Sequence, residues 1–384
     1  MTDLTTSLPL VLAGPILRRC TPERLVLWLA VREPVRVRIR LDAGEGGLHE
    51  RLLAPDEPGC RMLSAGTRLH YLLIDLALDQ PLPTDRWIGY TLDLQSLSTP
   101  AGPWSGCADW APDLCYSGRR SPGFVLPSRV SSLMHGSCRK PHHPDRDGLA
   151  EADRLLARCL ERNALAGCAP AEGGAEADVL PAWPSALALT GDQVYADDVA
   201  GPMLHALHQV VAALGLPDEP LAGGDLIGID KAQALYRHPA GFYRRETLLP
   251  RHKRNLALIE VLFGGVEKPV FTTDSAHNHL ITLGEVLAMY LLAWSPALWP
   301  LVDLEPPASL AESSRKLYQA ERSAIESFAA DLPAVRRLFA HLPVAMIFDD
   351  HDITDDWNLS REWEEVAYGH PFSKRVIGNA LFGY

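Results

Sequence analysis

Two short apolar segments, each followed at once by acidic side chains, constrain the fold of this chain most. The first reads ALALTGDQVYADD from Ala186, and the second reads VAMIFDDHDITDDWN from Val344. Each apolar run suits one buried strand, and helical patterns separate the two runs, so we expect an α/β fold with helices layered on a sheet. Ligands of such sheets bind beyond the carboxyl ends of the strands. Both acidic clusters are therefore expected at one edge of the sheet.

The second cluster places six polar, mostly acidic side chains within eight positions. They are Asp349, Asp350, His351, Asp352, Asp355 and Asp356. Like charges at this density repel one another unless cations or protons compensate. Carboxylate and imidazole ligands suit hard or borderline divalent and trivalent ions, which favours a metal site. An alternative for Asp349 and Asp352 is that they cap a helix or turn.

A third strand end carries a cysteine. The strand-like run Arg129–Met134 precedes the sequence HGSCR, which places Cys138 beside the other two clusters. A lone cysteine is more often an inert buried residue, so its position is what points to a ligand. The helical patterns and one Gly-rich loop complete this part of the chain. Helices are predicted over Asp147–Asn163, Met203–Leu214, Leu280–Trp294 and Ser309–Ala330, and the loop over Ala166–Pro181.

The first 100 residues have β character. In Val35–Leu41 (VRVRIRL) apolar and arginine side chains alternate strictly, as in a half-buried antiparallel strand whose arginines face solvent. Several such runs, separated by Pro, Gly and Asp, predict a small β-sandwich of immunoglobulin or fibronectin type. We predict three regions: the sandwich over residues 1–95, a linker over 96–128, and an α/β domain over 129–384.

Charge and cysteine usage exclude several classes. The net charge of −12 argues against nucleic acid and anionic membranes as partners. Seven cysteines without a CxxC pair argue against a disulfide scaffold or a zinc ribbon. No apolar run reaches about 18 residues, and the N-terminus lacks the pattern of a secretory signal. A cytoplasmic protein without a membrane span is expected.

Three motifs occur in a fixed order, GSC, GDQVYAD and FDDHD, each after a strand. This series resembles the alkaline phosphatase D (PhoD-like) family of calcineurin-like metallophosphoesterases. The resemblance implies an N-terminal β-sandwich followed by an α/β metallophosphoesterase sandwich. It also implies a hydrolase that cleaves small phosphate mono- or diesters with a metal-activated water and two metal ions, for which iron and calcium are candidates.

The resemblance implies roles for three residues at the first ion. Cys138 would be a thiolate ligand to a ferric-type ion, and Tyr195 would coordinate the same ion. Asp192 would bridge the two ions.

The second acidic cluster would supply the other metal site. The resemblance assigns Asp350 with the pair Asp355 and Asp356 as its ligands, and it places His351 close to the oxygen of the leaving group. His351 would then stabilise or protonate the departing alkoxide. Arg139 is predicted to neutralise phosphate oxygens, although a surface arginine is the simpler interpretation.

The sequence after Asp356 contains no further motif of the GDxH type, which the family's second half carries. The chain therefore resembles the amino-terminal part of a longer enzyme, with an incomplete sandwich. We expect an exposed sheet edge, weak metal binding, and poor solubility or self-association. The oligomeric state is left open.

Two alternative functions follow from these observations. One is a non-catalytic descendant that serves as a binding or scaffold module. The other is a different metal-dependent hydrolase, such as a nuclease. A further set of polar residues between helical segments either lines a substrate pocket or forms helix caps and interdomain contacts. These are Tyr243, Arg244, Arg245, His277, Asn278 and His279.

Overall fold

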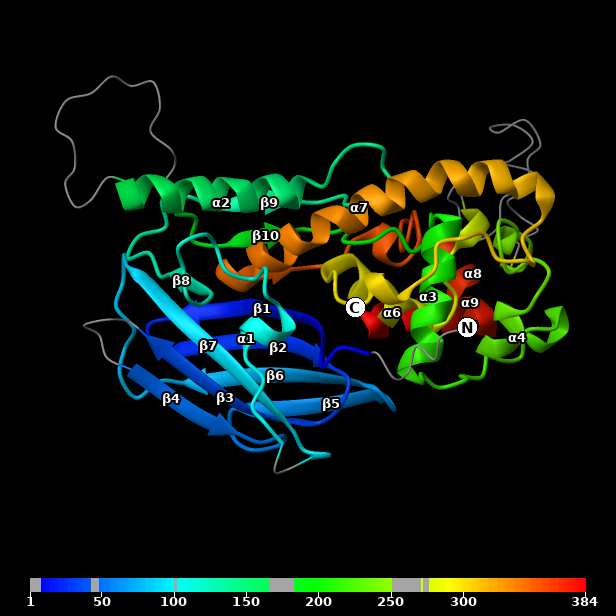
Figure 1. Ribbon diagram of the computed structural model, residues 1–384. Helices are drawn as coiled ribbons and strands as arrows, with labels where there is room; N and C mark the ends of the chain where they lie inside the picture. The colour runs from blue at the N-terminus through cyan, green and yellow to red at the C-terminus, as the bar shows by residue number, and fades with distance from the viewer. Residues whose placement is uncertain (1–7, 43–47, 100–101, 166–182, 251–270, 272–275) are drawn as a thin grey trace, which may run out of the picture.

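The computed structural model describes the whole chain except residues 1–7, 43–47, 100–101, 166–182, 251–270 and 272–275. In the described part, eight strands form two four-stranded sheets with the orders β1-β2-β6-β5 and β4-β3-β7-β8. These strands are β1 Val11–Thr21, β2 Arg24–Val31, β3 Val35–Asp42, β4 Leu48–Leu53, β5 Cys60–Gly66, β6 Leu69–Ala77, β7 Trp87–Ser96 and β8 Gly123–Val125. The two sheets form the sandwich in the lower part of Figure 1.

Strand β3 shows why the sandwich forms. Its residues Val35, Val37, Ile39 and Leu41 are buried between the sheets. The arginines between them lie on the outer face, where Arg38 and Arg40 both bind the carboxylate of Asp93 on β7. The period of two in the sequence therefore corresponds to one buried and one exposed face.

The segment 96–128, predicted as a linker, contributes to the sandwich. It contains the short helix α1 (Cys107–Trp110), and its strand β8 pairs with β7 in antiparallel fashion. Phe124 of β8 is fully buried in the sandwich core. Burial of this aromatic ring stabilises the pairing of a turn-rich segment with the sheet. The segment has no periodic pattern of apolar residues, so its sequence does not predict this strand.

A third sheet contains three parallel strands in the order β11-β10-β9. They are β9 Met134–Gly136, β10 Leu187–Leu189 and β11 Val344–Met346. The predicted strand over Arg129–Met134 was placed too early, because the parallel register pairs Leu187 with Met134. Together with the helices, this sheet confirms the predicted α/β class.

Helices cover the parallel sheet. Figure 1 shows α2 (Gly148–Leu165) and α7 (Arg315–His341) as two long helices above it. The other α-helices of the described region are α3 Gly201–Leu214, α4 Ala232–Tyr236, α6 Leu283–Trp294, α8 Arg361–Gly369 and α9 Pro371–Gly383. The predicted loop 166–181 lies outside the described residues.

Helix α7 is longer than the sequence predicted. It continues through Pro333 to His341, although a proline within a helix removes one hydrogen bond and costs about 3 kcal/mol. Leu332, Val335 and Leu338 are fully buried in the main core. Their burial offsets the cost, because each buried aliphatic side chain contributes roughly 1.5–3 kcal/mol.

The sandwich packs directly against the helical part. The hydroxyl of Tyr90 on β7 donates a hydrogen bond to the carbonyl of Ala340 on α7, at 2.8 Å, and the group is buried. Trp28 of β2 meets Trp294 at the end of α6 edge to face, with ring centres 6.0 Å apart. These contacts fix the orientation of the sandwich relative to the parallel sheet.

Candidate metal centre

The loops that follow the three parallel strands meet at the carboxyl edge of the sheet. The backbone N–H of Cys138 donates to the carbonyl of Gly191, and the N–H of Arg139 donates to that of Asp192, at 3.2 and 2.8 Å. The N–H of Ala196 donates to the carbonyl of His351, at 2.8 Å. The three motifs are therefore joined by main-chain hydrogen bonds.

Asp192, Asp350 and His351 form the one group of at least three such side chains in the described region that can hold a metal ion. Each offers a ligand atom, and these atoms all lie within 4.8 Å of one another. Asp192 is buried, whereas the other two are half-buried. The structure thus brings together three of the residues that the sequence predicted.

Asp192 has the environment of a metal ligand. Its Oδ2 accepts a hydrogen bond from the thiol of Cys138 at 3.2 Å, while its Oδ1 is buried and has no hydrogen-bond partner among the described residues. Burial raises the pKa of Asp192, and the charge of Asp350 acts in the same direction. A cation beside Oδ1 would supply the missing interaction, so the donor set fits a hard or borderline ion.

His351 is held from behind by a carboxylate. Its Nδ1 lies 2.8 Å from Oδ2 of Asp197, a side chain that is completely buried. This hydrogen bond raises the pKa of His351 to about 9. The ring also stacks on Tyr195, with ring centres 4.4 Å apart. Both interactions fix the orientation of the imidazole, as carboxylates behind metal-binding histidines do.

The backbone at the site lies in a conformation that side chains rarely adopt. Cys138, Asp192 and Asp356 have φ angles of +57°, +50° and +61°. Gly191 has a φ of +128°, and a Cβ built on it would lie 2.3 Å from the Cβ of Asp349. Strained residues of this kind cluster at functional sites, where the surrounding structure enforces them.

Cys138 and Tyr195 lie next to the group. The Cys138 side chain is exposed at the edge of the sheet and hydrogen-bonds to Asp192. Burial raises the pKa of Tyr195, and the charges of Asp192 and Cys138 add to the effect. The tyrosine therefore stays a neutral hydroxyl unless a cation compensates its charge.

Asp355 and Asp356 support the site through their backbone. The N–H of Asp356 donates to Oδ2 of Asp350 at 3.2 Å, and the N–H of Asp355 donates to Oδ2 of Asp197 at 3.0 Å. Neither carboxylate belongs to the three-residue group. Burial raises the pKa of Asp355, and the neighbouring charge of Asp356 acts with it.

Arg139, predicted to neutralise phosphate oxygens, is held in an ion pair within the protein. Its guanidinium binds Asp147 through two nitrogens, at 2.9 and 2.6 Å, and donates to the carbonyl of Ala293 at 2.6 Å. The same group lies over the ring of Phe328. Arg139 therefore ties the residue before α2 to α6 and α7, and it also lines the cavity beside Cys138. The sequence showed its position after the strand but not these partners.

Lys140, the next residue, is the cation near the site. It is ion-paired with Asp198, and its Nζ lies 5.4 Å from the centre of the Tyr195 ring. His142 also approaches Asp198, at 3.6 Å. The sequence alone does not reveal these partners of Lys140.

Asp352 holds together the loops that carry the candidate metal ligands. Its fully buried carboxylate accepts hydrogen bonds from the N–H groups of Gln193, Val194 and Asp349, and from the hydroxyl of Tyr290. With Asp349 it forms a capping box, so the capping alternative is confirmed for this pair. Burial raises the pKa of Asp352 to about 6.

Several polar residues between residues 241 and 295 form hydrogen bonds inside the protein. Arg245 is fully buried and donates to Oε1 of Glu285 at 2.7 Å and to the carbonyl of His279 at 2.9 Å. Asn278 accepts the N–H of Tyr243 and donates to the carbonyl of Val199. Of the two alternatives, these contacts favour internal support over a substrate pocket.

A cavity of about 430 Å³ opens beside Cys138. It lies between the ends of β9 and β10 and the start of α2, and Ser137, Gln193 and Glu151 contribute polar groups to its wall. This space is large enough for a small organic ester next to the candidate metal centre.

Comparison with known proteins gives likenesses only among solved structures. No family model and no curated protein matches the sequence. Among solved structures, the chain is similar to a structure of PhoD, with a TM-score of 0.34 and 11% identity over 99% of this chain and 46% of that chain. The chain thus spans about half the length of that structure. Separately, none of the helices in the described part of the chain combines the length and apolar character needed to cross a bilayer.

Proposed function

We propose that this chain carries the metal site of a PhoD-like metallophosphoesterase, with Asp192 and Asp350 as metal ligands and His351 beside them as the proton donor. The observation that carries the proposal is the buried Oδ1 of Asp192, which has no described hydrogen-bond partner beside a second carboxylate and an imidazole. The order of the GSC, GDQVYAD and FDDHD motifs supports the family assignment. The substrate class would be small phosphate mono- or diesters.

Cys138 and Tyr195 would complete the coordination of a first ion, with Asp192 shared between two ions. The thiol of Cys138 already hydrogen-bonds to Asp192, so a modest rotation redirects its sulfur. Asp350 would hold a second ion together with Asp355 and Asp356. Iron and calcium remain our candidates, because the set combines thiolate and phenolate donors with carboxylates.

The bound metal would supply Lewis-acid activation of a phosphoryl oxygen and of water. His351 would act on the leaving group. Its ring is held by Asp197 and by the face of Tyr195, and in the metal-free protein it carries a proton at neutral pH. A protonated imidazole at this position can donate its proton to a departing alkoxide. Lys140 can add positive charge near the phosphate.

A second candidate is a metal-binding module without turnover. It is favoured by the finding that the described residues contain a single group of three possible ligands. Such a module would bind an ion at Asp192, Asp350 and His351 but would not hydrolyse esters. Turnover separates the two candidates.

The test is hydrolysis of bis-p-nitrophenyl phosphate by the 384-residue chain, after incubation with Fe²⁺, Mn²⁺ or Ca²⁺. We expect metal-dependent turnover that falls at least about 100-fold in Asp192→Asn and in His351→Gln. Asp349→Asn is the matched control, since it removes a neighbouring charge at a capping position that asparagine also suits. Metal binding without turnover would support the module, and cleavage of single-stranded DNA in preference to the small ester would indicate a nuclease.

A further inference from the structure

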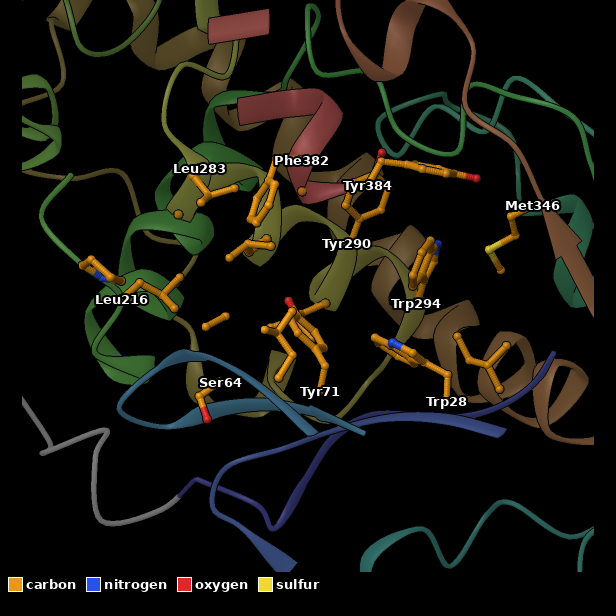
Figure 2. Close-up of a pocket in the computed structure, with 18 of the residues that line it drawn as sticks. Trp28, Ser64, Tyr71, Leu216, Leu283, Tyr290, Trp294, Met346, Phe382 and Tyr384 are labelled. Carbon is orange, nitrogen blue, oxygen red and sulfur yellow. The ribbon is translucent and has the colours of Figure 1, made fainter. Parts of the chain in front are cut away.

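A cavity lined by aromatic side chains lies between the sandwich and the helical part, and its lining contains none of the candidate metal ligands. It has a volume of about 610 Å³. Figure 2 shows Trp28 and Tyr71 of the sandwich on one side and Leu283, Tyr290 and Trp294 of α6 on the other. A volume of this size is typical of sites for small organic ligands, which often lie between domains.

The walls are aromatic and ordered. Trp28 stacks on Tyr71 with ring centres 5.6 Å apart, and Trp294 lies 5.0 Å from Tyr290. Tyr290 in turn meets Tyr384 edge to face at 5.7 Å. Rings that already pack on one another are pre-organised, so a flat or apolar ligand can fill the space at a low entropic cost.

Two lining residues carry charge, and only one of them has its charge compensated. The carboxylate of Glu219 accepts hydrogen bonds from the N–H of Leu283, from Asn379 and from Arg375, at 2.7, 3.0 and 2.8 Å. Arg18 is half-buried, and its guanidinium has neither a hydrogen bond nor an ion pair with any residue in the described part of the chain.

Arg18 therefore gives the cavity a cationic side. The buried hydroxyl of Tyr384, which also lacks a hydrogen-bond partner among the described residues, contributes to the same wall. Burial lowers the pKa of Arg18. A carboxylate would satisfy the guanidinium through two parallel hydrogen bonds and could accept another from a tyrosine hydroxyl.

We propose that this cavity binds an apolar monocarboxylate, aromatic or acyl, whose carboxylate pairs with Arg18 while its apolar body lies among Trp28, Tyr71 and Trp294. Charge complementarity favours an anion over a neutral or cationic ligand, because a cation would face an uncompensated guanidinium. The proposal does not depend on phosphoesterase activity. Tyr290 connects the two sites, since its ring lines the cavity and its hydroxyl donates to Asp352.

The experiment is isothermal titration calorimetry of the full chain with 2-naphthoate and with its uncharged counterpart 2-naphthamide. The acid is expected to bind at least about tenfold more tightly than the amide, because only the acid forms the charge-assisted pair. Arg18→Gln should bring the two affinities to within about twofold of each other. Arg19→Gln is the matched control: Arg19 is the next residue of β1, is exposed and does not line the cavity.

A second variant tests the role of the cavity volume instead of the role of the charge on Arg18. Ala65→Trp places a large ring in the cavity wall on the edge strand β5 and should abolish binding of both compounds. The proposal is overturned if neither compound binds the wild-type chain, if acid and amide bind equally, or if Arg18→Gln leaves the acid unaffected. Concentration-dependent dimerisation without ligand binding would likewise overturn it and assign the face to a second copy.

Discussion

The Nδ1 atom of His351 lies 2.8 Å from Oδ2 of Asp197, whose side chain is completely buried. The same Oδ2 accepts the backbone N–H of Asp355. One carboxylate thereby joins the loop after β10 to the loop after β11 and orients the imidazole. Asp197 stands within the GDQVYAD motif, but no role for it followed from the sequence.

Replacing Asp197 by asparagine should lower the pKa of His351 from about 9 toward the ordinary value near 6.5. The carboxylate raises this pKa by a charge-assisted hydrogen bond, and the amide removes the charge. A histidine NMR titration of the metal-free protein measures the change. An unchanged His351 titration in Asp197→Asn would contradict this account.

Gly191→Ala should destabilise the protein by about 2 kcal/mol or more. The new Cβ would lie 2.3 Å from the Cβ of Asp349, and the φ of +128° is unfavourable for any side chain. Urea unfolding measures the loss. Gly148→Ala is the control, because nothing lies within 4 Å of its Cβ position at the start of α2. Equal stability of the two variants would refute the proposed close approach.

The buried pair of Arg245 and Glu285 should be strongly coupled. Arg245→Met leaves a buried carboxylate without its cation and is expected to cost about 3–5 kcal/mol. Adding Glu285→Gln removes that charge and keeps the cap of α6, so the double variant should be less destabilised than the sum of the single ones. Chemical denaturation of all four proteins measures the coupling, and strict additivity would contradict it.

His341 should make stability depend on pH. Burial lowers its pKa to about 3, so between pH 6.5 and 3 the unfolded chain binds a proton that the folded chain does not. The contribution of His341 is present in full above pH 6.5 and is lost as pH falls toward 3. In His341→Phe, the fall in unfolding free energy between pH 6.5 and 4 should be smaller by up to about 1.4 kcal/mol per pH unit. Parallel pH profiles for both proteins would disprove this.

The sequence predicted what its local patterns determine. The alternation in Val35–Leu41 corresponds to the buried face of β3, and the acidic bursts do follow parallel strands. Asp192, Asp350 and His351 come together as expected. The reason is that the carboxyl ends of parallel strands lie at the same edge of their sheet. These inferences needed only the period of a strand and the geometry of an α/β sheet.

Tertiary contacts decided the remaining features. Phe124 joins the sandwich from a segment of turn composition, and α7 passes through Pro333 because its face is buried. Arg139 donates to the carbonyl of Ala293 on α6, 154 residues further along the chain. Such choices depend on neighbours distant in the chain, so local sequence patterns do not reveal them.

The most direct test of the metal centre is the metal content of the purified chain, followed by calorimetric titration of Fe²⁺, Mn²⁺ and Ca²⁺ into the metal-free protein. We predict at least one bound ion per chain, with affinity reduced at least about tenfold in Asp192→Asn and within about threefold of wild type in Asp349→Asn. Absence of binding in the wild type, or equal affinity in the wild type and both variants, would contradict the central claim that Asp192 holds a metal.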